Sequence, residues 1–73
     1  MIVSQQIRAA RAALRWSAQK LADESGLSLA TIQRMEAGEG VPTGLASNVQ
    51  EVQSALQRAG IEFIERGLRW QHG

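Results

Sequence analysis

Hydrophobic side chains recur every three or four residues along most of this chain, which is the spacing of one buried face of an α-helix. The pattern predicts four helical segments, at about residues 4–14, 17–26 and 28–36 and from near Thr43 or Ser47 to Gly60, the last with a capping-box-like S-N-V-Q at Ser47. The side chains expected on the buried faces are Ile7, Ala10, Leu14, Leu21, Ala22, Ser25, Ile32, Met35, Leu45, Val49, Val52 and Leu56. The predicted fold class is therefore mainly α.

Residues 17–36 are predicted to form two short helices around a tight turn. Ser17 can cap the first helix through its hydroxyl, and Gly26 can close it in the left-handed conformation. Ser28 then supplies the next cap. The outer face of the second helix carries Leu29, Ala30, Gln33 and Arg34. A short exposed helix held at an angle by its partner is the geometry of a helix-turn-helix, whose second helix enters the DNA major groove.

The segment from Ile61 to the end allows two interpretations. A hairpin that turns at Arg66 and Gly67 would place Phe63 opposite Trp70, whereas a helix would pair Glu62 with Arg66 and Glu65 with Arg69. We favour a strand for residues 61–65, because β-branched and aromatic residues follow Gly60. A hairpin needs a surface to pack on, and the same tail of a second subunit is a candidate. The expected dimer interface comprises Ile61, Phe63, Ile64 and Trp70.

Length and composition limit the possible functions. The 73 residues make one domain, divided here into residues 1–60 and a tail of residues 61–73. There is no cysteine, which excludes disulfides and thiolate metal sites and fits a cytoplasmic protein. No apolar run reaches the ~20 residues that span a membrane. The one histidine, His72, has no second ligand nearby, so we expect no metal, no cofactor and no enzymatic activity.

Charge is unevenly distributed along the chain. Residues 1–34 hold five basic and two acidic side chains, and residues 35–73 hold three basic and five acidic ones. The positive half contains the two short helices, as expected of a protein that binds nucleic acid. A basic targeting peptide in the first 22 residues is the alternative, which we discount because the same segment supplies an apolar face to the fold. Arg8, Arg11 and Arg15 form one stripe along the first helix, and the simplest interpretation is a solvated face.

Several residues at fixed spacing resemble the XRE-type family of Cro and phage-repressor helix-turn-helix regulators. They are Ile7 to Ser17, Leu21, Ala22, Gly26, Ser28, Ile32, the M-E-A-G at Met35 to Gly38, and Gly60 to Ile64. The resemblance covers about residues 4–64. It implies a lambda-repressor-like domain of four to five helices with a short C-terminal strand or hairpin.

The resemblance also implies roles for single residues. Ser28, Leu29, Ala30 and Arg34 match positions that meet the DNA in the family, and the adjacent Gln33 could contact adenine or a phosphate. The expected base contacts are Leu29, Ala30, Gln33 and Arg34, and the candidates for phosphate contacts are Ser17, Lys20, Ser28, Thr31 and Arg15. Arg11 matches an arginine that commonly pairs with the glutamate matched by Glu36, which would lock the first helix to the second helix of the motif. Two departures from the family pattern, Ala18 in place of a glutamine and Glu39 in a loop that is often basic, reduce the expected phosphate attraction.

These features together indicate a sequence-specific regulator that binds double-stranded DNA. The specific hypothesis is a homodimeric repressor that binds an inverted-repeat operator. The alternative is a protein-interaction module on the same fold, such as an antiactivator or an antitoxin, that binds a protein partner through Leu29 and Ala30 or through Phe63 and Trp70.

Overall fold

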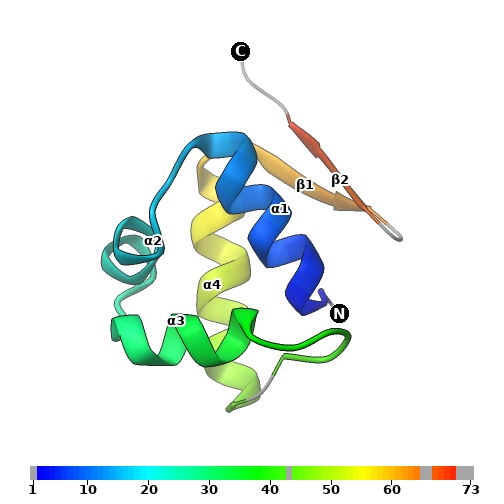
Figure 1. Ribbon diagram of the computed structural model, residues 1–73. Helices are drawn as coiled ribbons and strands as arrows, with labels where there is room; N and C mark the ends of the chain where they lie inside the picture. Colours follow the sequence, from blue (N-terminus) through cyan, green and yellow to red (C-terminus); the bar gives the residue numbers. More distant parts are fainter. Residues whose placement is uncertain (1, 43, 65–66, 71–73) are drawn as a thin grey trace.

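The computed structural model describes residues 2–42, 44–64 and 67–70, which form four helices followed by a two-stranded antiparallel sheet (Figure 1). The elements are α1 (Ser4–Leu14), α2 (Ala18–Ser25), α3 (Leu29–Glu36), α4 (Ala46–Arg58), β1 (Ile61–Ile64) and β2 (Gly67–Trp70). The mainly α class and the C-terminal hairpin are confirmed. The helical alternative for the tail is wrong, because residues 61–64 and 67–70 pair as strands.

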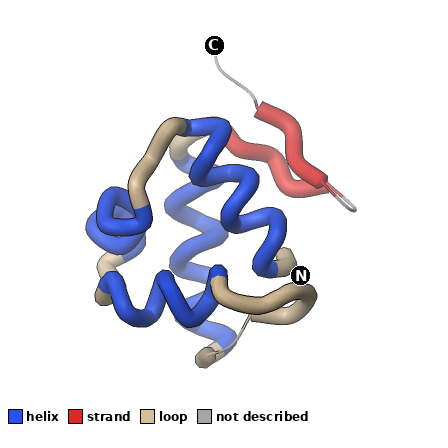
Figure 2. The backbone as a smooth tube through the Cα atoms, viewed as in Figure 1, coloured by secondary structure: helices blue, strands red, loops and turns tan. Residues whose placement is uncertain are grey.

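The helices enclose a core to which every one of them contributes. α4 contacts α1, α2 and β1, while α3 contacts α1 and α2 and crosses one end of the bundle (Figures 1 and 2). The buried apolar side chains of the described residues are Ile2, Ile7, Ala10, Leu21, Ala22, Ile32, Met35, Val49, Val52, Ala55, Leu56 and Ile61. Removing one valine, leucine, isoleucine or methionine side chain from water stabilises the fold by about 1.5–3 kcal/mol, so these stripes position the helices.

Helix ends lie where short polar residues and glycine predict them. The Ser17 hydroxyl accepts a bond from the N–H of Lys20 (3.0 Å), and the Ser28 hydroxyl accepts one from the N–H of Thr31 (3.2 Å). Gly26 closes α2 with φ 74°. No heavy atom lies within 4 Å of a Cβ built at Gly26, so its conformation and not lack of space favours glycine there. The turn between α2 and α3 is therefore fixed by local chemistry.

The start of α4 differs from the prediction. The helix begins at Ala46, and Leu45 is its N-cap without a side-chain cap bond, so Ser47 lies inside the first turn. Leu45, expected in the core, is 68% exposed. The reason is that a residue ahead of the first turn does not follow the helical period of Val49, Val52 and Leu56. An apolar side chain is thereby left on the surface.

The hairpin has a different register from the expected one. Ile61 pairs with Trp70 and Phe63 with Leu68, not Phe63 with Trp70, because β2 already begins at Gly67. The shift is by two positions, so Ile61, Phe63 and Leu68 still share one face. On the other face Arg69 Nη1 lies 3.7 Å from Glu62 Oε2, a pair that neither sequence interpretation contained.

The apolar face of the hairpin packs on its own subunit. β1 contacts α4 and β2 contacts α1. Ile61 is only 3% exposed, and Phe63 and Leu68 pack against the core. Ile61 is therefore unavailable to a second subunit, contrary to the expected dimer interface, because the helices already cover it. Ile64 is exposed on the opposite face, and the Trp70 side chain lies outside what the structure describes.

None of the helices in the described part of the chain is long and apolar enough to cross a membrane.

Candidate nucleic-acid interface

The outer face of α3 carries side chains that are not buried in the core. Ala30, Gln33 and Arg34 are exposed and Leu29 is half-buried. The inner face of the same helix is buried through Ile32, Met35 and Glu36. None of the four predicted base-contact residues is packed into the interior. The inner face of α3 is therefore buried, and its outer face is available to a binding partner.

At the N-terminal end of α3, the side-chain hydrogen bonds of Ser28, Thr31 and Arg34 all lie within the helix and its cap. The hydroxyls of Ser28 and Thr31 lie 2.9 Å apart, and Arg34 Nη2 donates to the Thr31 hydroxyl at 3.3 Å. The Arg34 bond is long for an N–H donor and lies at the surface. The Arg34 guanidinium therefore needs to break only one weak contact to reach an external acceptor.

The C-terminal end of α3 is bound by three side chains of α1. The Ser4 hydroxyl donates to the carbonyl of Met35 at 2.5 Å. Arg8 Nη1 donates to the carbonyl of Glu36 and, at 2.8 Å, to that of Gly38. The carbonyls of Met35 and Glu36 belong to the last turn of α3, where carbonyls lack a partner within the helix, and Gly38 follows just beyond its end. α1 therefore satisfies acceptors that would otherwise need water. A cation at this end also interacts favourably with the helix dipole.

Arg11 and Glu36 form the strongest of these connections. Arg11 Nε lies 2.9 Å from Glu36 Oε2, and Arg11 Nη2 donates to Oε1 at 2.9 Å, so the guanidinium meets the carboxylate with two parallel bonds. Arg11 Nη1 also donates to the carbonyl of Trp16 at 3.0 Å. The Glu36 side chain is 9% exposed and that of Arg11 is 27% exposed. One arginine thus joins α1, the α1–α2 connection and α3.

Ser4 and Arg8 are positioning residues that the sequence analysis missed. From the sequence, Arg8 was expected on a solvated face, but the Arg8 guanidinium binds the end of α3. The available signal was the spacing of Ser4, Arg8 and Arg11 by four and three residues, which places all three on one face of α1. That spacing identifies a shared face but not the partners of Ser4 and Arg8, because these partners are backbone carbonyls, which every residue carries.

The loop after α3 is tied to the start of α1. The N–H of Ser4 donates to the carbonyl of Gly40 at 2.8 Å, and the Gln5 side chain accepts from the N–H of Gly40 at 2.9 Å. Glu39 is exposed in this loop. A carboxylate there would repel the phosphates of a duplex lying along α3.

The N-terminal end of α2 provides a second group of candidate contacts. Ser17 and Lys20 are exposed, as is Arg15, which closes α1 with φ 59°. Lys20 Nζ lies 3.2 Å from Glu24 Oε2 and 5.7 Å from the centre of the Trp16 ring. Exposed pairs of this kind contribute only about 0.3–0.5 kcal/mol, so a phosphate can replace the glutamate at little cost.

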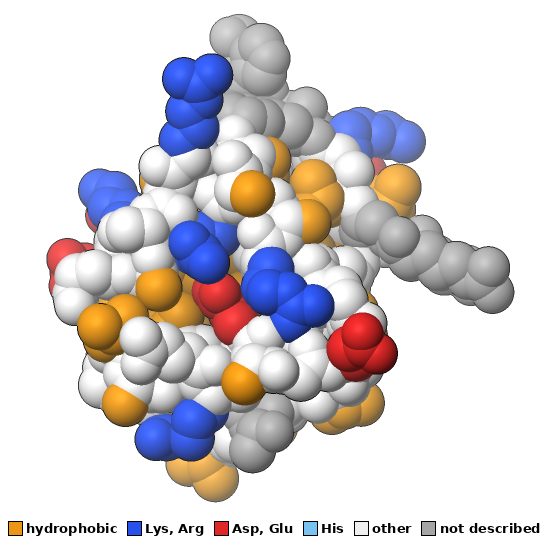
Figure 3. Space-filling model, in the orientation of Figure 1, with side chains coloured by type: hydrophobic (Ala, Val, Ile, Leu, Met, Phe, Trp, Pro, Cys, Tyr) orange, Lys and Arg blue, Asp and Glu red, His pale blue; other side chains and the backbone are white. Residues whose placement is uncertain are grey.

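Basic side chains do not gather into one patch on the face seen in Figure 3. They are spread over it, with acidic side chains between them. A broad positive field is therefore missing from this face, and its attraction for DNA must come from a few defined contacts. Among the described residues no group of three or more histidines, cysteines or carboxylates is placed to hold a metal ion.

Comparison with known families agrees with this geometry. A family model described as helix-turn-helix matches residues 7–46, more than half of the chain, from within α1 to the first residue of α4. Comparisons with curated proteins and with solved structures gave no significant match. The match includes α2, α3 and the turn between them, and it leaves the hairpin outside.

Proposed function

Because this chain belongs to the XRE-type, lambda-repressor-like helix-turn-helix family of DNA-binding regulators, we propose that it is a homodimeric repressor that binds an inverted-repeat operator through the major groove. The observation that carries the proposal is the contrast within α3. Ala30, Gln33 and Arg34 are exposed on one face, while the opposite face is buried. Recognition of a DNA sequence requires exposed side chains on a helix that is held in a fixed orientation, and α3 has both.

Each side chain of this surface has a matching base edge. Arg34 donates two bonds to the O6 and N7 atoms of a guanine, and Gln33 pairs in the same bidentate way with adenine. Ala30 and the exposed part of Leu29 contact a thymine methyl group. A good bidentate contact contributes about 1–3 kcal/mol of discrimination between bases, so Arg34 and Gln33 are expected to carry most of the specificity.

Phosphate contacts would position α3 in the groove. Ser17 and Ser28 use their hydroxyl oxygens as acceptors in the helix caps, so their hydroxyl protons remain for a phosphate or, at Ser28, for Thr31. Lys20 and Arg15 add positive charge beside the N-terminal end of α2, where backbone N–H groups also favour an anion. The exposed Glu39 opposes this attraction, so two subunits acting together are needed for tight binding.

A salt titration tests the proposal. Binding of the purified protein to random-sequence duplexes should weaken between about 50 and 200 mM salt, with a slope of about −2 per subunit from Arg15 and Lys20. Lys20→Ala should make that slope shallower by about 1. Arg69→Ala is the matched control, because it removes one exposed positive charge from the hairpin and should leave the slope unchanged.

A lack of DNA binding would overturn the proposal. If neither random duplexes nor duplexes from the chain's own genomic neighbourhood are bound at low salt, the repressor hypothesis is abandoned. The protein-interaction module would then take its place, with Leu29 and Ala30 as part of a protein-binding surface.

A further inference from the structure

The side chain of Gln6 connects the hairpin to the start of α1. Its amide nitrogen, Nε2, donates to the carbonyl of Ile64, the last residue of β1, at 2.9 Å. Its amide oxygen, Oε1, accepts at 2.9 Å from the N–H of Val3, the N-cap of α1. Valine has no polar side-chain atom with which to cap a helix, so this end of α1 depends on Gln6. Gln6 is only 8% exposed, so losing either bond is costly.

The two residues before Gln6 hold the end of α3 and the loop that follows it. The Ser4 hydroxyl donates to the carbonyl of Met35, in the last turn of α3. The loop is bound on both sides of Gly40, whose carbonyl accepts from the N–H of Ser4 and whose N–H donates to Gln5 Oε1. Because the three residues of α1 are consecutive in its first turn, a change in that turn reaches the hairpin, α3 and the loop together.

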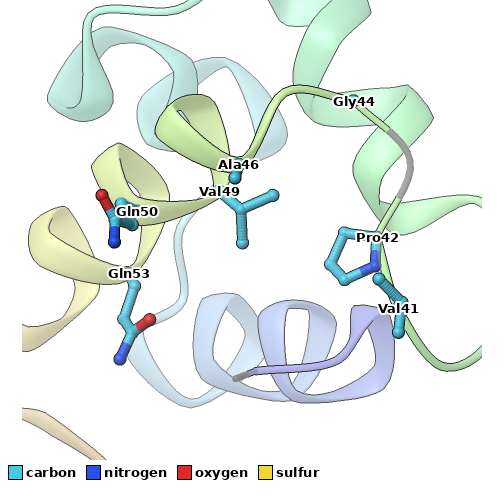
Figure 4. Close-up of a pocket in the computed structure, with 7 residues that line it drawn as sticks. All are labelled: Val41, Pro42, Gly44, Ala46, Val49, Gln50 and Gln53. Atoms are coloured by element: carbon cyan, nitrogen blue, oxygen red, sulfur yellow. The ribbon is translucent and has the colours of Figure 1, made fainter.

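The other side of this loop borders a hollow. An apolar hollow of about 220 Å³ lies between the loop and the first turns of α4, with Val41 and Pro42 on one side and Val49 and Gln50 on the other (Figure 4). Val41 is 72% exposed, although Pro42 is buried. Packing against α4 therefore holds the loop only in part, and its position depends also on the bonds from the start of α1.

The hairpin depends on the helices for its stability. Two strands alone are marginally stable in water, so β1 and β2 need the surface beneath them. β2 contacts α1, and its Leu68 is a half-buried side chain that packs against the core (Figure 1). An element supported in this way can open locally without unfolding of the whole domain.

We propose that the hairpin is a strap that sets the position of the C-terminal end of α3 through the first turn of α1. While the hairpin is docked, Gln6 closes that turn, and Ser4 and Gln5 hold α3 and its loop. When the hairpin lifts from α1, Gln6 loses its partner on β1, and the bonds from Ser4 and Gln5 weaken. Arg8 and Arg11, further along α1, keep their bonds, so α3 is loosened and not released.

The consequence for DNA binding rests on the proposed function. Base contacts require side chains that are held close to their productive positions, whereas phosphate contacts dominate the binding of random DNA. Loosening of α3 should therefore lower the affinity for an operator more than the affinity for random duplexes. The docked hairpin would thus favour the sequence-specific complex.

Amide hydrogen exchange, measured residue by residue by NMR on the full chain without DNA, tests the coupling. Leu68→Ala weakens the packing of β2 and should raise the exchange rates of the Ser4 and Gly40 amides by about 3- to 10-fold, because local opening of the first turn exposes both. Leu27→Ala is the matched control, the same substitution at another half-buried leucine packed against the core, in the turn between α2 and α3. It should leave both rates within about 2-fold of the wild-type values.

Gln6→Glu cuts the connection to the hairpin and keeps the cap of α1. A carboxylate still accepts from the N–H of Val3 but has no proton to donate to the carbonyl of Ile64. In the Gln6→Glu variant, Leu68→Ala should no longer change the exchange rate of the Gly40 amide, because the connection through residue 6 is already broken. Leu68→Val and Leu27→Val are a milder matched pair for the case that an alanine variant does not fold.

The inference is overturned if the Leu68 and Leu27 variants change the Gly40 rate to the same extent, or if the effect of Leu68→Ala persists in the Gln6→Glu variant. The two proposals can fail separately. Exchange coupling in a chain that binds no duplex would overturn the proposed function and support the strap. Duplex binding by a chain without this coupling would support DNA binding and overturn the strap.

Discussion

The two ends of α3 are held in different ways. At the C-terminal end, Ser4, Arg8 and Arg11 of α1 bind two carbonyls of the last turn and the buried Glu36 carboxylate. At the N-terminal end, Ser28 and Thr31 bond only within the helix and remain accessible. Under the proposed function, this difference separates two requirements of a helix that contacts DNA. The C-terminal end fixes the direction of the helix, and the N-terminal end keeps its donors and its outer side chains available for the duplex.

The largest expected effect comes from removing the Arg11–Glu36 ion pair at the C-terminal end of α3. Arg11→Ala leaves the Glu36 carboxylate buried without its partner, which should lower the free energy of unfolding by about 2–3 kcal/mol, somewhat less than for a fully buried pair because Arg11 is partly exposed. Urea denaturation measures this loss. The double variant Arg11→Met with Glu36→Leu is the control and should recover part of it, since no buried charge remains. A loss below about 0.5 kcal/mol for Arg11→Ala would mean that the pair does not fix α3.

A smaller effect is expected at Arg8. Arg8→Ala removes a charged donor from the carbonyls of Glu36 and Gly38, which should cost about 1–1.5 kcal/mol and increase hydrogen exchange in the last turn of α3. Arg8→Lys is the matched control, because it keeps the charge near the helix end and should lose less. If Arg8→Ala leaves exchange in α3 unchanged, the anchoring of this end depends on Ser4 and Arg11 alone.

The smallest effect on stability is expected at Arg34, on the exposed outer face of α3. Arg34→Ala should change the free energy of unfolding by less than about 0.5 kcal/mol, because its one bond to Thr31 is weak and exposed. It should lose about 1–3 kcal/mol of preference for guanine at one position, measured on duplexes selected from random DNA by the wild-type chain. An Arg34→Ala variant that unfolds more readily but selects the same bases would place Arg34 in the fold and not in recognition.

The sequence predicted those features that depend on local chemistry. Ser17, Gly26 and Ser28 mark the helix ends because a cap or a left-handed residue acts within a few positions, and Ile32 and Met35 are buried because the helical period places them together. Leu45 was mispredicted because it directly precedes Ala46, the first residue of the helix, so the helical period of the buried stripe does not extend to it. The hairpin register depends on where the turn begins, and the covering of Ile61 depends on helices distant in sequence, so neither could be obtained from the tail alone.

Two of the anchors of α3 bind carbonyl oxygens of the main chain, an atom that every amino acid carries. They therefore hold the helix without regard to which residues stand at positions 30, 33 and 34. Under the proposed function, new target sequences can therefore be acquired by exchanging these outer residues, without compensating changes elsewhere in the domain. The same fold would then support different DNA specificities, which makes it a suitable starting point for engineering them.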